Sequence, residues 1–190
     1  MRSREVIDII ADVVSETSKD CKIIIGGHTK SPKMVDCPKI HYIFGNAQYV
    51  KDRLDEISKS AVGNVSKFPL IVLFCPFSED RNNPNYHNQA KVNILVAVSS
   101  MLEWSNEQRE KYSFENILRP IYRNFLKALK RDGRISIDYN GVISHKYSEN
   151  YVYGRYGAWT TSGEKVSEPI DAICISDLKL NIKLSNCREK

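Results

Sequence analysis

The longest regular pattern of apolar and polar positions lies between Ser105 and Gly133. Apolar side chains recur there three and four positions apart, which places them on one stripe of a helix. Ser105 and Gln108 fit a capping box at its start. Pro120 removes a backbone donor and clashes with the preceding turn, so we expect a kink or a junction of two helices near Arg119. The members of the stripe are Phe114, Ile117, Leu118, Ile121, Tyr122, Phe125, Leu126 and Leu129.

Two shorter helices are expected earlier in the chain. The first carries an apolar stripe formed by Val6, Ile9, Ile10, Val13 and Val14. The second begins after Asn46, which can cap it, and ends at Gly63–Asn64. Its stripe is formed by Val50, Leu54, Ile57 and Ala61.

Apolar runs of strand length predict a sheet. Short strands are expected at residues 21–25 and 40–44. Residues 69–75 are apolar at every position after the first and are bounded by prolines, a pattern typical of a central strand covered on both faces. Residues 92–99 predict a second strand of the sheet.

The final strand changes phase. Its apolar residues have odd numbers at Ile173 and Ile175, but even numbers from Leu178 to Leu184. One extra residue near Ser176–Asp177 restores a common apolar face, so we expect a β-bulge there.

Three further segments carry turn or loop signals. Asn140–Gly141 predicts a tight hairpin that joins residues 135–139 to 142–147, because both turn residues tolerate positive φ. Residues 78–88 have the composition of an exposed loop. Residues 147–159 form an aromatic-rich segment that we expect to be largely loop, although a strand pair with half-buried aromatics fits it too.

The fold class that these elements predict is α/β in the broad sense (α+β). We expect one domain over residues 1–190, with a mixed, mainly antiparallel sheet packed against two or three helices. The apolar fraction of 42% and the charged fraction of 27% are ordinary for a globular chain. No apolar run reaches the ~20 residues that span a bilayer, so we expect no membrane partner.

Candidate chemistry is sparse. The five cysteines are odd in number and include no CxxC pair, so we expect reduced thiols in a cytosolic protein. The four histidines lie far apart, and Gly26–Gly27 lacks the ending of a phosphate-binding loop, so we expect no metal and no cofactor. No nucleophile, base or acid stands in a recognisable catalytic pattern, and we expect no enzymatic activity.

Aromatic and basic side chains provide the candidate contact residues. The segment 147–159 interleaves tyrosines and a tryptophan with cations, which suits a protein interface, bases of a nucleic acid, or a structural strand pair. The long helix also has a basic face, expected to be solvated, or to contact an acidic subunit or passing DNA. That face consists of Arg119, Arg123, Lys127, Lys130 and Arg131.

Three stretches resemble one family. Residues 113–126 (SFENILRPIYRNFL), 68–77 (FPLIVLFCPF) and 169–180 (PIDAICISDLKL) are similar to the tail-terminator, or tail-completion, proteins of long-tailed bacteriophages and prophages. The likeness lies in the order of elements and covers roughly residues 1–184. Neck-connector and head–tail joining proteins, the stoppers and adaptors of the same particles, are near neighbours.

The resemblance implies a structural role without catalysis. Members assemble as a hexameric ring on the head-proximal end of the tail tube, where the ring stops tube growth and docks the head. It therefore implies a homo-oligomer, a tail-tube protein and a neck or head-completion protein as partners. The location implied is the virion, after assembly in the cytoplasm of a bacterial host.

A ring of that kind needs two different complementary patches on each subunit. We expect them at residues 78–88 and 147–159, and the high aromatic content of the second segment suggests an extra neck partner. A nucleic-acid-binding module remains the alternative. The candidate interface residues are Arg81, Tyr86, His87, Tyr147, Tyr151, Tyr153, Arg155, Tyr156 and Trp159.

Overall fold

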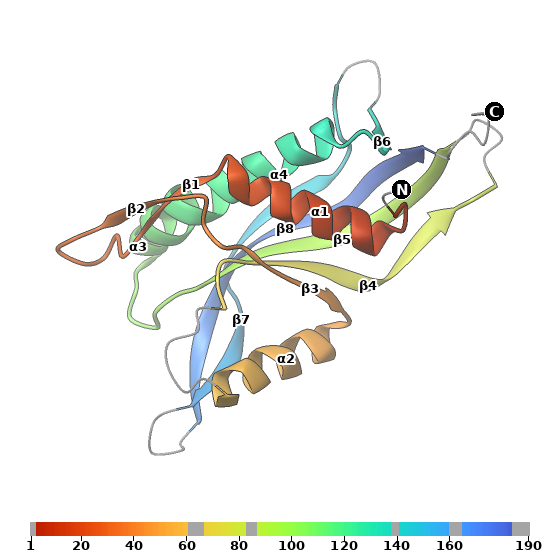
Figure 1. Cartoon of the computed structure of the whole chain (residues 1–190). Helices are drawn as coiled ribbons and strands as arrows, with labels where there is room; N and C mark the ends of the chain where they lie inside the picture. Colours follow the sequence, from red (N-terminus) through yellow and green to blue (C-terminus); the bar gives the residue numbers. More distant parts are fainter. Residues whose placement is uncertain (1–2, 61–66, 83–86, 138–140, 160–164, 184–190) are drawn as a thin grey trace.

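The computed structural model describes residues 3–60, 67–82, 87–137, 141–159 and 165–183 (Figure 1). In chain order the elements are α1 (Val6–Lys19), β1 (Lys22–Ile25), β2 (Lys33–Asp36), β3 (His41–Gly45), α2 (Ala47–Ser60), β4 (Leu70–Asp80), β5 (His87–Ser99), α3 (Asn106–Arg109), the π-helix η1 (Glu110–Leu118), α4 (Arg119–Arg131), β6 (Ile135–Ser136), β7 (Lys146–Trp159) and β8 (Lys165–Lys183).

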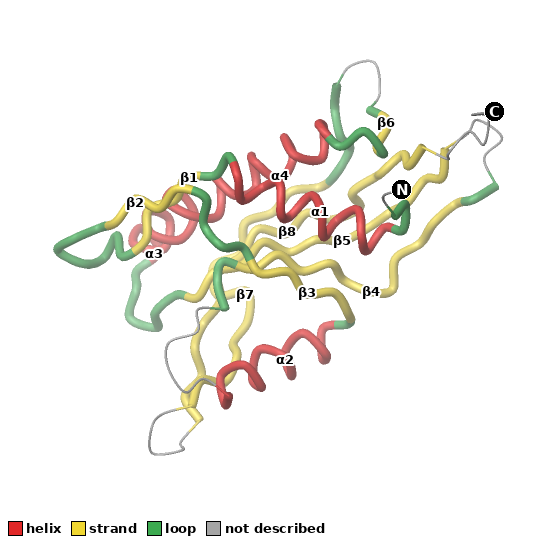
Figure 2. Tube along the Cα trace, viewed as in Figure 1, coloured by secondary structure: helices red, strands yellow, loops and turns green. Residues whose placement is uncertain are grey.

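Six strands form one mixed sheet in the order β3-β4-β5-β8-β6, with β7 also paired to β8. Among the strands of this sheet that the structure describes, β3 and β4 pair in parallel and the other pairs are antiparallel. Strands β1 and β2 form a separate antiparallel pair. Helices α1 and α4 lie on one face of the large sheet and α2 on the other (Figures 1 and 2). The predicted α+β fold, a mixed, mainly antiparallel sheet packed against two or three helices, is confirmed.

Strand β4 separates two hydrophobic cores, as its two-sided apolar pattern predicts. Ile71 and Leu73 pack into the larger core with α1 and α4. Leu70 and Val72 alternate with them and pack into the smaller core beneath α2. All four side chains are buried, so the prediction of a strand covered on both faces is confirmed.

The long helical stretch begins at the predicted capping box, and its junction between a π-helix and an α-helix lies at the predicted position. Ser105 accepts a bond from the Gln108 backbone N–H, while the Gln108 side chain accepts one from the Ser105 N–H, completing the capping box. The following π-helix ends where Arg119 donates to the Phe114 carbonyl, five residues back. Pro120, which has no N–H, stands at the start of α4, where the ladder changes to α spacing. The expected junction near Arg119 is confirmed.

The predicted bulge in the last strand is also present. Val92 lies opposite Leu178 and Ile94 opposite Ile175, so two residues of β8 face the single residue Asn93. Asp177, one of the two, has a φ of 55° and donates its backbone N–H to the Asn93 side chain at 3.0 Å. The apolar side chains on both sides of the bulge therefore share one buried face.

Three loop predictions need correction. Residues 78–80 and 87–88 belong to β4 and β5, which pair across Ser78–Asp80, so the loop prediction is wrong for these residues. The two arms of the predicted hairpin at Asn140–Gly141 pair with β8 through β6 and β7, because that 19-residue strand offers a long edge to both. Residues 138–140 themselves lie outside the described ranges. The segment 147–159 is strand β7, so the strand-pair interpretation of this segment is correct.

Helix α2 has its expected start. The side chain of Asn46 accepts a bond from the Tyr49 backbone N–H at 2.8 Å, as a cap should. The predicted end at Gly63–Asn64 falls outside the described ranges. Within those ranges, no helix is both long enough and apolar enough to cross a bilayer.

Candidate interaction surface on strand β7

Strand β7 has one paired edge and one open edge. It runs antiparallel to β8, and within the described ranges its other edge pairs with no strand. Asn150 lies opposite Ala172 and Gly154 opposite Ile170, so three β7 residues face the single residue Asp171. Val152, the middle residue of this bulge, has a φ of 54°, which a β-branched residue rarely adopts.

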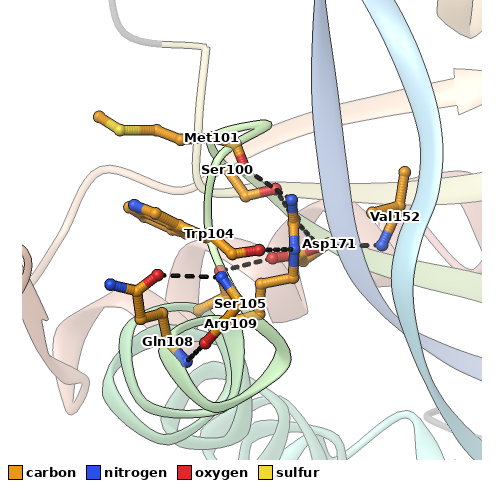
Figure 3. Close-up of polar contacts among 9 residues, drawn as sticks. Ser100, Met101, Trp104, Ser105, Gln108, Arg109, Val152 and Asp171 are labelled. Atoms are coloured by element: carbon orange, nitrogen blue, oxygen red, sulfur yellow. Dashed lines mark hydrogen bonds and ion pairs between the residues drawn. The ribbon is translucent and has the colours of Figure 1, made fainter.

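The carboxylate of Asp171, on the paired strand β8, accepts a hydrogen bond from the backbone of this bulge (Figure 3). Its Oδ1 accepts the Val152 backbone N–H at 3.0 Å and Arg109 Nη1 at 2.8 Å. Its Oδ2 accepts the Ser113 hydroxyl at 2.7 Å. Asp171 is completely buried and the Arg109 side chain is 4% exposed. The strained backbone of Val152 is therefore stabilised by a charge-assisted bond.

The same arginine orders the loop after β5. Its guanidinium donates to the Met101 carbonyl at 2.5 Å, the Trp104 carbonyl at 3.3 Å and the Ser100 hydroxyl at 2.7 Å. A buried ion pair offsets its desolvation cost only when its remaining groups are bonded too. Within the described ranges no buried side-chain N or O lacks a partner. The network thus connects the loop 100–104 to β7 through fully satisfied bonds.

On the side of β7 that faces η1 and α4, Arg119 joins two carboxylates. It donates to Glu149 at 2.7 and 2.8 Å and to Glu110 at 2.5 and 3.1 Å. Bonds from this guanidinium lower the pKa of both glutamates. The Tyr151 hydroxyl donates to Glu110 at 2.8 Å, which raises the pKa of Tyr151 to about 12. The Tyr147 hydroxyl donates to Glu149. Both tyrosines are thereby fixed in place while their rings stay about 40% exposed.

On the other side of β7, an apolar groove of about 130 Å³ separates the strand from α2. Tyr153 and Tyr156 form part of its wall, and its only charged lining residues among those described are Lys51 and Arg155. Tyr156 is buried and packs on Phe68, with ring centroids 5.3 Å apart. The remaining wall includes Val50, Leu54, Phe74 and Ala97.

The candidate interface residues do not form one patch. Tyr147, Tyr151, Tyr153, Arg155 and Tyr156 come together around β7. Arg81 bonds Glu79 beside Glu5 of the N-terminal segment, and His87 starts β5 opposite Lys183. β7 pairs with β8 between Lys165 and Ser176, whereas His87 pairs with Lys183 and Asp80, next to Arg81, pairs with Gln89, so both positions lie away from β7. Tyr86 falls outside the described ranges, as does the side chain of Trp159.

The predicted basic face of the long helix is divided. Arg119 belongs to the half-buried cluster with Glu110 and Glu149, so its expected solvation is wrong. Arg131 pairs with Asp20 at 2.6 Å, and Lys127 lies 3.8 Å from the same carboxylate. Arg123 and Lys130 remain exposed without an ion pair among the described residues. The positive charge of this face is therefore partly neutralised.

Sequence reasoning missed Arg109 and Asp171. Both occupy positions that read as polar, and a charge between Ile170 and Ala172 in an apolar strand is the one signal that could have revealed the pair. Elsewhere, the described residues bring no three metal-ligating side chains together. A hollow of about 400 Å³ between α1 and α4 is lined mainly by charged and polar residues such as Glu16, Asp20 and Arg131.

Comparison with known proteins adds no family to this picture. The sequence matches no protein-family model and no curated protein.

Proposed function

We propose that the protein is a non-enzymatic phage structural subunit that closes the head-proximal end of the tail tube as a ring. In this role it contacts the tube protein on one side and a neck or head-completion protein on the other, within the virion. The likeness of residues 68–77, 113–126 and 169–180 to tail terminators is the source of this role. The stopper and adaptor proteins of the neck are the variant of the proposal nearest to it.

One observation carries the idea that the protein acts through contact. Three of the four tyrosines of β7, a strand with one open edge among the described residues, stay exposed: 43% for Tyr147, 40% for Tyr151 and 45% for Tyr153. Tyrosine provides a large, rigid contact area at low entropic cost, and an open edge offers unpaired backbone donors and acceptors. The buried bond from the Val152 N–H to Asp171, itself paired with Arg109, holds this strand in a fixed shape, which favours binding by pre-organisation.

Mass measurement of the purified chain, alone and mixed with tail-tube protein, tests the proposal. We expect an assembly near six times the 21.8 kDa chain mass and a further complex with tube protein. Tyr151→Ala should weaken association at least about tenfold, as interface tyrosines often do. Met34→Ala is the control, because Met34 is 63% exposed on β2, which pairs with β1 and not with the large sheet. A chain that stays monomeric under both conditions contradicts the proposal.

DNA binding by the same purified protein, measured at several salt concentrations, distinguishes the proposal from the nucleic-acid alternative. A DNA-binding protein loses affinity steeply as salt rises, because it releases counterions from phosphates. Pairing of Lys127 and Arg131 with Asp20 reduces the positive charge available for such contacts. We expect no DNA binding at low salt beyond a weak passing contact. Tight, salt-sensitive binding would favour the alternative.

A further inference from the structure

The groove between α2 and β7 has two charged lining residues among those described, and both are cations. Arg155 and Lys51 line it, and both are exposed without an ion pair among the described residues. The wall is apolar, formed by side chains such as Leu54 and Phe74 from α2 and β4. An apolar hollow with two unpaired cations suits a segment that presents one apolar side chain next to a carboxylate.

The chain itself displays such a segment. In the loop after β5, Leu102 is 53% exposed and Met101 is 42% exposed, although both are large and apolar. Glu103 follows them directly, is exposed, and makes no ion pair among the described residues. The loop therefore projects apolar side chains with an adjacent negative charge, the complement of the groove.

The loop after β5 and strand β7, which borders the groove, are both bonded to one buried network. Arg109 donates to the Met101 carbonyl of the loop, and its partner Asp171 accepts the Val152 N–H of β7. Figure 3 shows Met101 and Val152 on either side of this pair. Because loop and strand are already ordered, little conformational freedom is lost when they meet another surface.

We infer that Leu102 and Glu103 of one copy seat in the α2–β7 groove of a second copy, with Glu103 facing Arg155 and Lys51. This inference rests on the proposed ring-forming role and names the contact between neighbouring subunits. Loop and groove are different patches, so each contact leaves one unused loop and one unused groove. A head-to-tail contact of this kind generates a ring when the rotation between neighbours closes, as the proposed role requires.

A charge exchange tests the contact. Glu103→Lys alone, and Arg155→Glu with Lys51→Glu, should each weaken self-association at least about tenfold, because like charges then face each other. Mixing the two variants sets the reversed loop charge of one chain against the reversed groove charges of the other, which restores attraction across the contact. The mixture should therefore associate again where each variant alone does not. Light scattering over a dilution series measures both effects.

Matched controls are available on the same chain. Glu115→Lys and Lys111→Glu change exposed charges on η1, away from loop and groove, and should leave association unchanged. Leu102→Ser removes the apolar anchor without changing charge and should also weaken association. Circular dichroism of each variant verifies that it is folded.

The outcomes separate this inference from the proposed role. If Glu103→Lys, Leu102→Ser and the double variant Arg155→Glu with Lys51→Glu all assemble like the wild type, the contact lies elsewhere. That result overturns the inference, while the ring proposal stands. A wild-type chain that never self-associates overturns both. Binding of the groove to tube protein, lost in Arg155→Glu with Lys51→Glu while self-association persists, would assign the groove to that partner and also overturn the inference.

Discussion

Replacing Asp171 with asparagine removes one charge from the buried network and keeps the shape of the side chain. Arg109 would then remain buried without a counter-charge, because its side chain is only 4% exposed. Removing one partner of a buried pair costs about 3–5 kcal/mol. Domains of ordinary size unfold with a free energy of about 5–15 kcal/mol, so the variant should lose a large part of its stability.

Urea unfolding followed by circular dichroism measures this loss. With a slope of about 2 kcal/mol per molar urea, the midpoint should fall by about 1.5–2.5 M. Amide exchange should also accelerate at the Val152 bulge and in the loop 100–104, since Asp171 and Arg109 restrain both. These two regions are far apart in sequence, so their joint loosening would identify the shared network as the cause.

Asp177→Asn is the matched control, because it makes the same chemical change six residues further along β8. The Asp177 carboxylate meets Lys91 and Lys146 at the surface, where water screens the pairs. Asparagine also tolerates the positive φ of that position. We expect a smaller shift of its midpoint than for Asp171→Asn. Equal midpoints for the two variants, or a shift below about 0.5 M for Asp171→Asn, would refute the reasoning.

Two further predictions concern the surface and the helix start. Hydrogen bonds from Lys146 and Lys91 lower the pKa of Asp177 to about 2, below its usual 3.8, so its stabilisation is present above about pH 4 and lost as pH falls toward 2. An NMR titration of this carboxyl should have its midpoint near 2, and a midpoint near 4 contradicts the geometry. Ser105→Ala breaks the capping box and should cost about 1 kcal/mol in urea unfolding. Ser31→Ala in an exposed turn is its control, and equal stability of the two variants would show that the cap contributes nothing.

Elements that depend on the spacing of side chains within one segment could be predicted from the sequence. The stripe from Phe114 to Leu129 predicts its helix because apolar spacing repeats at the helical period. The change of phase between Ile175 and Leu178 predicts the bulge because one face of β8 must stay buried. The capping box follows from the side chains of Ser105 and Gln108, which lie within one turn of each other.

Tertiary structure decided the features whose partners lie far apart in the chain. Arg109 meets Asp171 across 62 positions, and no local spacing marks such a pair. Strands β6 and β7 pair with β8 because its long edge is available in the assembled sheet, whereas the Asn140–Gly141 signal predicts only that a turn is feasible. Arg119 bonds Glu149, 30 positions further along the chain, because the folded sheet brings β7 next to α4; the helix pattern alone predicted a solvated side chain.

The sequence by itself thus determined the three helical stretches, the two-sided strand β4 and the phase of β8, since each depends on which side chains must leave water together. Only the fold decided that Tyr147, Tyr151 and Tyr153 stay exposed on a strand with an open edge and that Arg155 and Lys51 line an apolar groove. Those arrangements arise when distant segments become neighbours, which the order of residues along one element does not specify.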